Sequence, residues 1–376
     1  MQLLSFGRAI AGFAVALLST STALNLQGFD GHELDPYANT KLPPNRTESA
    51  SPIVQGACYS PFHNPEYPLN GAWNAYGLDT AMDSDFSIMK NYVTVARTYY
   101  SSFYGYPVAP QAAKHGVGLY LGVYMTDESW YENQVSDAVA AVRDYPDTIK
   151  AILVGNENIA PAGPYSAAEV SRRISALRSR IQLETGRSVK IGTVQRIGEW
   201  IDGNTRSAML ALADNCDIVG VNIYPFFDGS YNANDPLALL NGAWNSMLTV
   251  YPSSKVRLTE VGFPTAGAPP SFAPNNVPSL ANSMAFYNAF LNWSPASGGQ
   301  EAFWFMFFDR RPDDNTMGIE LERYFGFYTW DRKAKASALP ISLSATTPAP
   351  TPAPTAAPTV AGTSSQVCRV HKIFKK

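Results

Sequence analysis

Two glutamates stand where a carboxyl group could do chemistry. One ends the run Leu153-Val154-Gly155-Asn156-Glu157, and the other ends Arg257-Leu258-Thr259-Glu260, so each follows directly on apolar residues. A side chain at the end of such an apolar run lies just outside the packed interior, but the strand that carries it is rigid. Two carboxyls held together can cleave a glycosidic bond, because one donates a proton to the leaving oxygen while the other, ionised, attacks or stabilises the sugar cation.

The pair of glutamates, rather than either one alone, supports this hypothesis. A single glutamate at such a place is most simply a polar strand end without chemistry. If the two converge, their shared negative field and partial burial should raise the pKa of one above that of the other. A separation of about 5–5.5 Å between the carboxyl groups would predict cleavage with retention of configuration. We expect the amide of Asn156 to hydrogen-bond a sugar 2-hydroxyl beside the acid.

Eight short apolar runs, rich in β-branched and aromatic residues, are expected to position these groups. They alternate with amphipathic or polar stretches of helical length. The alternation predicts an α/β fold, a closed (β/α)8 TIM barrel, whose reactive groups lie at the C-terminal ends of the strands. An open doubly wound sheet is the alternative, but no glycine-rich phosphate-binding loop follows the early strands. The predicted strands are Ile53–Tyr59, Val93–Tyr100, Val117–Met125, Ile149–Glu157, Val189–Gln195, Ile218–Tyr224, Val256–Val261 and Ala302–Asp309.

The spacing of apolar side chains predicts helices between these strands. In one of them, Ser166 and Glu169 have the spacing of a capping box, which fixes where the helix begins. The predicted helices are Asp83–Lys90, Asp127–Tyr145, Ser166–Thr185 and Leu280–Trp293.

The composition of the 376 residues excludes some classes of partner. A net charge of −3 argues against nucleic acid and anionic membrane surfaces. Charged residues make up 16%, below the roughly 25% of an average globular chain, while aromatic residues make up 12%. A surface poor in charge and rich in aromatic rings favours a secreted protein that faces carbohydrate.

The two ends of the chain differ in character from the middle. Residues 1–23 resemble a cleaved secretory signal, with an early arginine, a short apolar run and small residues. Residues 337–366 are rich in Thr, Pro and Ala and should form a disordered linker, because they have nothing to bury. Between these lie a polar lead-in at 24–51 and the barrel domain at 52–336, and a short basic tail follows at 367–376. Asn45 and Asn292 begin N-glycosylation acceptors.

Six short motifs lie in order along the predicted barrel. Together they resemble those of glycoside hydrolase family 17, the endo-β-1,3-glucanases and their relatives, from about Gln55 to Lys335. One of the motifs, Thr259–Thr265, departs from the family pattern in one place, with Phe263 where tryptophan is more usual. The motifs are Gly56–Tyr59, Val95–Tyr99, Val154–Glu157, Val221–Phe227, Thr259–Thr265 and Glu322–Tyr328.

The resemblance implies a retaining mechanism, with Glu157 as general acid/base and Glu260 as nucleophile. It implies β-1,3-glucan as the substrate and no metal or cofactor. Near the nucleophile it places Arg97, whose cation favours an ionised carboxylate. The alternative for Arg97 is a salt bridge that closes the barrel end. The expected substrate-binding residues are Asn156, Tyr59, Arg97, Tyr99, Tyr224, Phe227, Trp304 and Asp309.

The aromatic members of this set are expected to stack on the apolar faces of β-glucose. Ordinary core packing is the alternative for Tyr224 and Phe227, and Trp304 faces either the cleft, as we expect, or the helices. After Phe303–Asp309 the family commonly has another acidic residue and a nearby lysine, whereas this chain continues with two arginines. We therefore assign the supporting acidic role to Asp309.

Neither the three cysteines nor the four histidines form a metal-binding motif, so no metal is expected. Cys58 and Cys216 are expected to be buried thiols, and a Cys58–Cys216 disulfide in an oxidising compartment is the alternative. Cys368, in the tail, could pair with another chain.

The sequence thus predicts a secreted, extracellular or cell-wall glycosidase that cuts β-1,3-glucan internally. We expect a monomer that contacts no nucleic acid and, once the signal is removed, has no membrane span. Three alternatives stay open. A glucan transglycosylase would use the same two carboxyls, a non-catalytic cell-wall protein would only bind glucan, and another barrel glycosidase would act on a different β-glycan.

Overall fold

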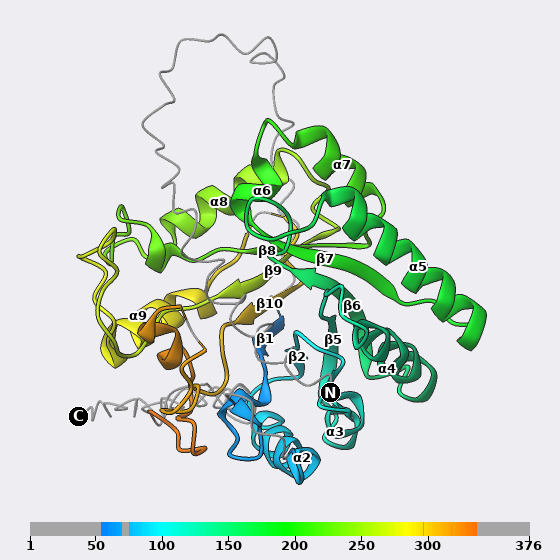
Figure 1. Cartoon of the computed structure of the whole chain (residues 1–376). Helices are drawn as coiled ribbons and strands as arrows, with labels where there is room; N and C mark the ends of the chain where they lie inside the picture. The colour runs from blue at the N-terminus through cyan, green and yellow to red at the C-terminus, as the bar shows by residue number, and fades with distance from the viewer. Residues whose placement is uncertain (1–53, 70–74, 296, 317, 337–376) are drawn as a thin grey trace, which may run out of the picture.

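The computed structural model describes residues 54–69, 75–295, 297–316 and 318–336. In this part of the chain, parallel strands close a barrel that is surrounded by helices (Figure 1). Each barrel strand pairs with the next one along the chain, and the last pairs with the first, which excludes an open sheet and confirms the predicted (β/α)8 barrel. The barrel strands are β1 Val54–Cys58, β2 Val95–Arg97, β5 Gly118–Val123, β6 Ile149–Asn156, β7 Lys190–Arg196, β8 Ile218–Asn222, β9 Val256–Val261 and β10 Glu301–Trp304.

Each predicted apolar run corresponds to one of these strands, although β7 ends one residue later than predicted, and β10 begins one residue earlier and ends at Trp304. A small antiparallel hairpin, β3 Ser102–Phe103 and β4 Tyr106–Pro107, follows β2 and was not predicted. The barrel strands are covered on both faces, by helices outside and by packed side chains inside, so their sequences are continuously apolar.

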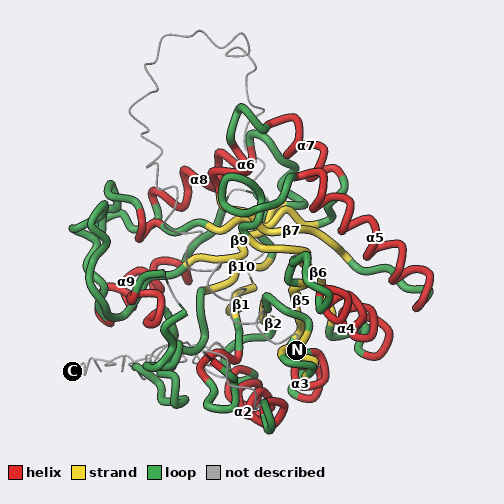
Figure 2. Tube along the Cα trace, in the orientation of Figure 1, coloured by secondary structure: helices red, strands yellow, loops and turns green. Residues whose placement is uncertain are grey.

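Helices lie outside the strands, as Figure 2 shows in red. The four predicted helices correspond to α2, α4, α5 and α9, although α2 begins earlier than predicted and α4 begins later. The others were not predicted, and α3 and α6 are too short to show an apolar period. The bounds are α2 Leu78–Met89, α3 Ala109–Lys114, α4 Tyr131–Asp144, α5 Ala167–Thr185, α6 Ile197–Ile201, α7 Arg206–Asp214, α8 Ala238–Leu248 and α9 Leu280–Leu291.

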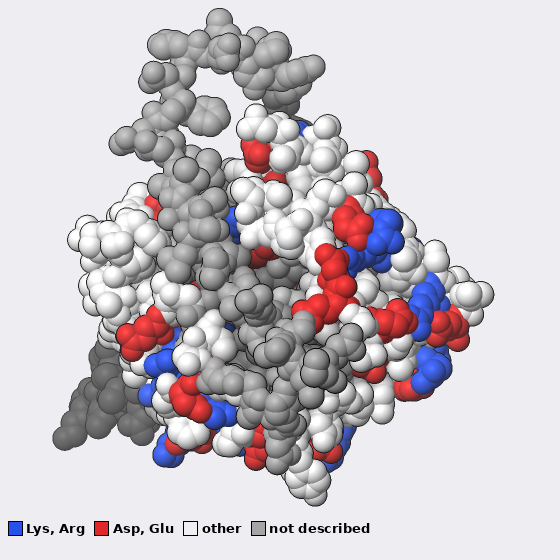
Figure 3. Space-filling model, in the orientation of Figure 1, with Lys and Arg blue, Asp and Glu red and all other residues white. Residues whose placement is uncertain are grey.

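The longest of these helices, α5, has defined ends. The Ser166 hydroxyl accepts a hydrogen bond from the Glu169 backbone N–H at 3.1 Å, as the capping box predicts. The helix is followed by Gly186, whose φ of 64° lies in the left-handed region that favours glycine. On its outer face Arg172 pairs with Glu169. Charges of both signs alternate over α4 and α5 (Figure 3).

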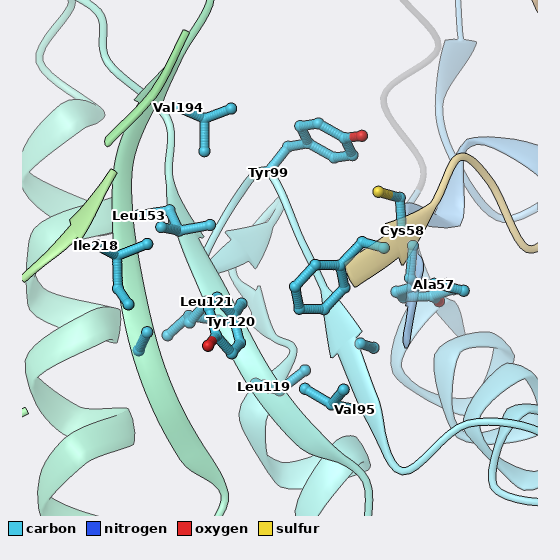
Figure 4. Packing of buried hydrophobic residues seen from close by; sticks show 14 of the residues in the cluster. Ala57, Cys58, Val95, Tyr99, Leu119, Tyr120, Leu121, Leu153, Val194 and Ile218 are labelled. Carbon is cyan, nitrogen blue, oxygen red and sulfur yellow. The ribbon is translucent and has the colours of Figure 1, made fainter. Parts of the chain in front are cut away.

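Buried apolar side chains fill the barrel. Figure 4 shows side chains such as Val95, Tyr120 and Leu153, carried by different strands, meeting in its interior. At Gly192 of β7, an added Cβ would lie 1.8 Å from the Ile218 carbonyl oxygen of β8. Only glycine fits there without moving a neighbouring strand.

The chain after β10 closes one side of the barrel mouth. It contains the 3-10 helix η5 Glu320–Tyr324, and within the described residues no α-helix follows β10. Two ion pairs hold the last described residues, one to α2 and one to the segment that directly follows β10. Arg332 pairs with Asp85 at 2.8 Å, and Lys335 pairs with Asp309 at 2.6 Å. None of the described helices has the length and apolar character needed to span a bilayer.

Candidate active site

A pocket of about 610 Å³ opens among the C-terminal ends of the barrel strands. Both predicted glutamates line it, together with Tyr99, Asn156 and Tyr224. The structure therefore brings together in one pocket side chains that follow or end β2, β6, β8 and β9, as a barrel enzyme requires.

A β-bulge accompanies each glutamate. From Leu153 to Asn156, β6 advances three residues while its partner β7 advances two. From Leu258 to Glu260, β9 advances two residues while β8 advances one. Bulges turn a side chain away from the regular alternation of a strand and are frequent beside active sites. The extra residue in each strand therefore sets the direction of the carboxyl.

The backbone around Glu157 has an unusual conformation. Gly155 has a φ of 76°, and an added Cβ there would lie 2.4 Å from the side chain of Asn158. Glu157 itself has a φ of 47°, in the left-handed region that residues other than glycine rarely adopt. Strain of this kind persists only where the surroundings hold it, and it clusters at functional sites.

Glu260 is surrounded by hydrogen-bond donors. Its Oε1 accepts hydrogen bonds from the Arg97 guanidinium and from the Tyr99 hydroxyl, the latter at 2.8 Å. Its Oε2 accepts one from the Tyr224 hydroxyl at 2.5 Å. Glu260 is 4% exposed, so one guanidinium and two hydroxyl donors surround a carboxyl that has almost no contact with solvent.

Glu157 has the opposite surroundings. It is 8% exposed, and the side-chain hydrogen bond that reaches it comes from the Asn222 amide to Oε1, at 2.7 Å. Burial, and secondly the charge of Glu260, raise the pKa of Glu157 to about 7, although the Asn222 hydrogen bond opposes the shift. At neutral pH this carboxyl therefore retains much of its proton.

Asn222, at the end of β8, links the two glutamates. Its amide also donates to the Asn156 side-chain oxygen at 3.2 Å, and its own oxygen accepts from the Thr259 hydroxyl at 2.8 Å. The same Asn156 oxygen accepts a hydrogen bond from Arg97, whose guanidinium also reaches Glu260. The predicted set did not include Asn222, although a polar residue at a strand end is the same signal that identified the glutamates.

Four predicted substrate-binding residues do not line the pocket. Arg97 lies behind the pocket wall, 1% exposed, and reaches the lining residues Glu260 and Asn156 by hydrogen bonds. The Tyr59 hydroxyl donates to Asp85 of α2 at 2.7 Å, outside the barrel. Trp304 is buried against α9, with its ring centroid 5.0 Å from that of Tyr287, so the expectation that it faces the cleft is wrong. Asp309 accepts hydrogen bonds from Lys335 and from the Gly326 N–H, and it supports the wall of the pocket from behind.

Two other predictions concern cysteines and metals. Cys58 and Cys216 are both free and buried, so they do not form the disulfide that was considered. Cys368 lies outside the described residues. Among the residues that the structure describes, no group of three or more His, Cys, Asp or Glu side chains could hold a metal ion.

The segment after β10 contributes pocket residues that were not predicted. Phe305, Met306 and Arg310 follow β10, and Glu322 and Phe325 come from η5 and its C-terminal end. Glu322 belongs to the motif Glu322–Tyr328. No periodic pattern in the sequence predicts that an irregular loop and a short 3-10 helix place this residue at the barrel mouth.

Known proteins resemble this chain in sequence and in fold. The sequence pattern of the BtgE/BtgC glycoside hydrolase domain matches residues 56–326. A glucan 1,3-beta-glucosidase of Arthroderma benhamiae is 26% identical over 272 residues, which cover 68% of this chain and 83% of that protein. A probable beta-glucosidase btgE of Aspergillus terreus is 25% identical over 287 residues, covering 70% of this chain and 49% of that protein. The chain thus spans about half the length of the second relative.

Solved structures show the same fold. An endo-laminarinase from Formosa superposes with a TM-score of 0.59 at 16% identity, covering 75% of this chain and 84% of that one. A glycoside hydrolase family 17 beta-1,3-glucanosyltransferase from Rhizomucor miehei gives a TM-score of 0.56 at 18% identity, covering 75% and 95%. Together with the family match, these similarities confirm the resemblance to family 17 that the six motifs indicated.

Proposed function

Because the chain belongs to the BtgE/BtgC glycoside hydrolase family, we propose that it cleaves internal β-1,3-glucosidic bonds of β-glucans with retention of configuration. Glu157 is the general acid/base and Glu260 is the nucleophile. The choice of substrate is supported by the names of the relatives and solved structures, which include a glucan 1,3-beta-glucosidase and an endo-laminarinase.

The observation that carries this proposal is the contrast between two carboxyls in one pocket. Burial and the neighbouring charge raise the pKa of Glu157 to about 7, so it can hold a proton. Glu260 is paired with Arg97 and accepts two tyrosine hydrogen bonds, so its surroundings suit a carboxylate. Two titratable groups with opposed surroundings correspond to the acid and the nucleophile of a glycosidase.

The reaction proceeds in two displacements. In the first, Glu260 attacks the anomeric carbon while Glu157 transfers its proton to the glycosidic oxygen, which leaves with the bonding electrons. In the second, Glu157, now a carboxylate, takes a proton from water. The resulting hydroxide attacks the anomeric carbon and displaces Glu260, so both glutamates return to their starting states.

Neighbouring side chains orient the sugar and the nucleophile. Arg97 and Tyr99 hold one oxygen of Glu260 and Tyr224 holds the other, which fixes the plane of the carboxyl. The Asn156 oxygen is occupied by Arg97 and Asn222, so the nitrogen of that amide is left to donate to the sugar 2-hydroxyl. A hydrogen bond there strengthens as the transition state forms.

An assay of new reducing ends on a soluble β-1,3-glucan tests this proposal. The purified protein should release reducing ends, and Glu260→Ala should lower the rate by orders of magnitude while its thermal melting stays cooperative. No release by the wild type on any β-glucan would leave only the glucan-binding alternative, and unchanged turnover by Glu260→Ala would remove the nucleophile.

Transglycosylation on the same carboxyls is the second candidate. The pocket wall carries several apolar rings, among them Phe227, Phe305 and Phe325, whose faces could hold an acceptor sugar and keep water out. A sugar hydroxyl would then replace water in the second displacement. Products longer than the starting oligosaccharide would indicate transfer, whereas a steady fall in chain length would indicate hydrolysis.

A further inference from the structure

The backbone leaves the regular strand at Glu157. The N–H of this residue still donates to the Val194 carbonyl of β7 at 2.9 Å, so it keeps the pairing of the barrel sheet. Its φ of 47° then turns the chain out of the strand, which ends at Asn156. A residue with a side chain keeps such a conformation only where its surroundings hold it, so the groups that hold the backbone of Glu157 bear on its chemistry.

A side chain of β7 continues the pairing where the backbone stops. β6 and β7 are neighbours in the barrel (Figure 1). The Gln195 Oε1 accepts hydrogen bonds from the N–H groups of Asn158 and Ile159, at 3.1 and 3.2 Å. One amide oxygen therefore replaces a strand carbonyl for the two residues that follow Glu157. Within the described part of the chain, no other acceptor reaches these two N–H groups.

The nitrogen of the same amide fixes its orientation. The Gln195 Nε2 donates to the Asn158 side-chain oxygen and to the Thr193 hydroxyl oxygen, each at 3.0 Å. These contacts and those of Oε1 agree with one assignment of the amide oxygen and nitrogen, and Gln195 is fully buried. The Asn158 amide is held in turn, because its nitrogen donates to the Met125 sulfur at 3.1 Å.

The loop that follows is folded closely around Asn158. The Tyr165 N–H donates to the Asn158 carbonyl at 3.0 Å, and the Ala160 N–H donates to the Tyr165 carbonyl at 2.9 Å. At Gly163, an added Cβ would lie 2.4 Å from the Asn158 Cα. Asn158 is thus packed against its own loop on one side and bound to Gln195 of the barrel on the other.

We propose that Gln195 is a positioning residue for the general acid/base. By holding the two N–H groups that follow Glu157, its amide keeps that residue in the conformation that directs its carboxyl to Asn222 and into the pocket. This inference rests on the proposed function of the pocket. Gln195 does not line the pocket, so its effect on the reaction passes through Glu157.

The nucleophile is held by separate groups. The hydrogen bonds to Glu260 come from Arg97, Tyr99 and Tyr224, in other parts of the barrel. A change at Gln195 should therefore impair the acid and leave the nucleophile in place. The difference is measurable, because a sugar leaving group needs a proton in the first displacement, whereas an acidic phenol leaves without one.

Two substrates with different leaving groups provide the test. We compare kcat/KM on a soluble β-1,3-glucan and on dinitrophenyl β-laminaribioside, with Glu157→Ala as the reference for a lost acid. Gln195→Met removes the acceptor and keeps a side chain of similar length. On the glucan its kcat/KM should fall about tenfold or more, since general acid catalysis contributes about 100- to 10,000-fold. On the dinitrophenyl glycoside, kcat/KM should stay near the wild-type value.

Gln195→Glu is the conservative variant. One carboxyl oxygen still accepts both N–H hydrogen bonds, so the ratio of the two rates should return toward that of the wild type. The added negative charge raises the pKa of Glu157 and so does not deplete its acid form.

Gln134→Met is the matched control. Gln134 is 4% exposed, and its amide also joins backbone groups, since it accepts from the Ser101 N–H and donates to the Ser102 carbonyl, each at 2.9 Å. It lies outside the pocket. Gln134→Met should lower the thermal midpoint and leave the ratio of the two rates unchanged.

Several results would overturn the inference. Gln195→Met with wild-type rates on both substrates would do so, and so would equal losses on both. If Gln195→Met fails to fold, Asn158→Ala decides, because it removes an oxygen that orients the Gln195 amide. It should show the same selective loss to a smaller degree, and an unchanged ratio would refute the role. A wild type that cleaves neither substrate refutes the proposed function itself, whereas cleavage that is indifferent to Gln195 refutes only this inference.

Discussion

At the scale of single residues, the account depends on the different protonation of two neighbouring glutamates. Burial raises the pKa of Glu157 to about 7, and the proton on this carboxyl is what the first displacement consumes. We therefore expect kcat/KM to fall as the pH rises through about 7, because the acid form is present below that value and lost above it. The profile is measured with a soluble β-1,3-glucan, and a rate that stays level across neutral pH would contradict the assignment.

Substitution of Asn222 should change the pH at which kcat/KM falls. Its hydrogen bond to Glu157 favours the ionised form, so removing it in Asn222→Ala should shift the falling limb to higher pH. Asn288→Ala, on the exposed face of α9, is the control and should keep the wild-type profile. A limb that moves to lower pH in Asn222→Ala would show that the amide does not act on the acid in this way.

The Tyr224 hydroxyl is expected to stabilise the nucleophile. Hydrogen bonds to charged groups contribute about 1.5–3 kcal/mol, so Tyr224→Phe should lower kcat/KM by about 10- to 100-fold. Tyr231→Phe, which changes a half-buried ring outside the pocket, is the matched control. Equal rates in the two variants would mean that the hydroxyl is dispensable.

At the scale of elements, the sequence predicts the barrel well because its signals are local. Parallel strands covered on both faces read as apolar runs, and α5 is delimited by its Ser166 cap and by Gly186. Side-chain direction is harder to predict, because neighbours on a strand point to opposite faces. Cys58 donates inward to the Thr259 carbonyl, whereas Tyr59, the next residue, points out to α2. A motif does not reveal which of two adjacent residues faces the sugar.

Close contact between strands gives a prediction at the same scale. Gly192→Ala would place a Cβ 1.8 Å from a backbone oxygen of β8, so we expect it to lower the free energy of unfolding by about 1–3 kcal/mol or more. Gly198→Ala meets open space and should leave stability unchanged or slightly higher. Denaturant unfolding of both variants checks this, and equal midpoints would contradict the packing described for β7 and β8.

At the scale of the whole molecule, the loop after β10 shows what the sequence does not predict. It carries no periodic signal, yet it supplies Arg310 and Glu322 to the pocket. Near its end Arg332 pairs with Asp85 of α2, and Lys335 pairs with Asp309, which follows β10. Contacts of this kind depend on the closed fold, so they become visible only in three dimensions.

The proposed domain division leads to a prediction about length. A shortened chain of residues 52–336 should fold and keep the kcat/KM of the full chain, because the pocket lies entirely within it. A chain that stops at residue 328 loses Arg332 and Lys335 and leaves Asp85 and Asp309 without these partners. Removing one partner of a buried ion pair costs about 3–5 kcal/mol, so its thermal midpoint should fall clearly. Equal midpoints for the two chains would contradict this role for the ion pairs.

Rescue by azide tests the assignment of the two glutamates most directly. Glu260→Ala and Glu157→Ala are incubated with an aryl β-laminarioside and sodium azide, and the configuration of the glycosyl azide is read by proton NMR. In Glu260→Ala, azide replaces the missing nucleophile in a single displacement, so the product should be the α-azide. In Glu157→Ala, azide attacks the glycosyl-enzyme and should give the β-azide. A β-azide from Glu260→Ala, or full turnover by that variant without azide, would contradict Glu260 as the nucleophile.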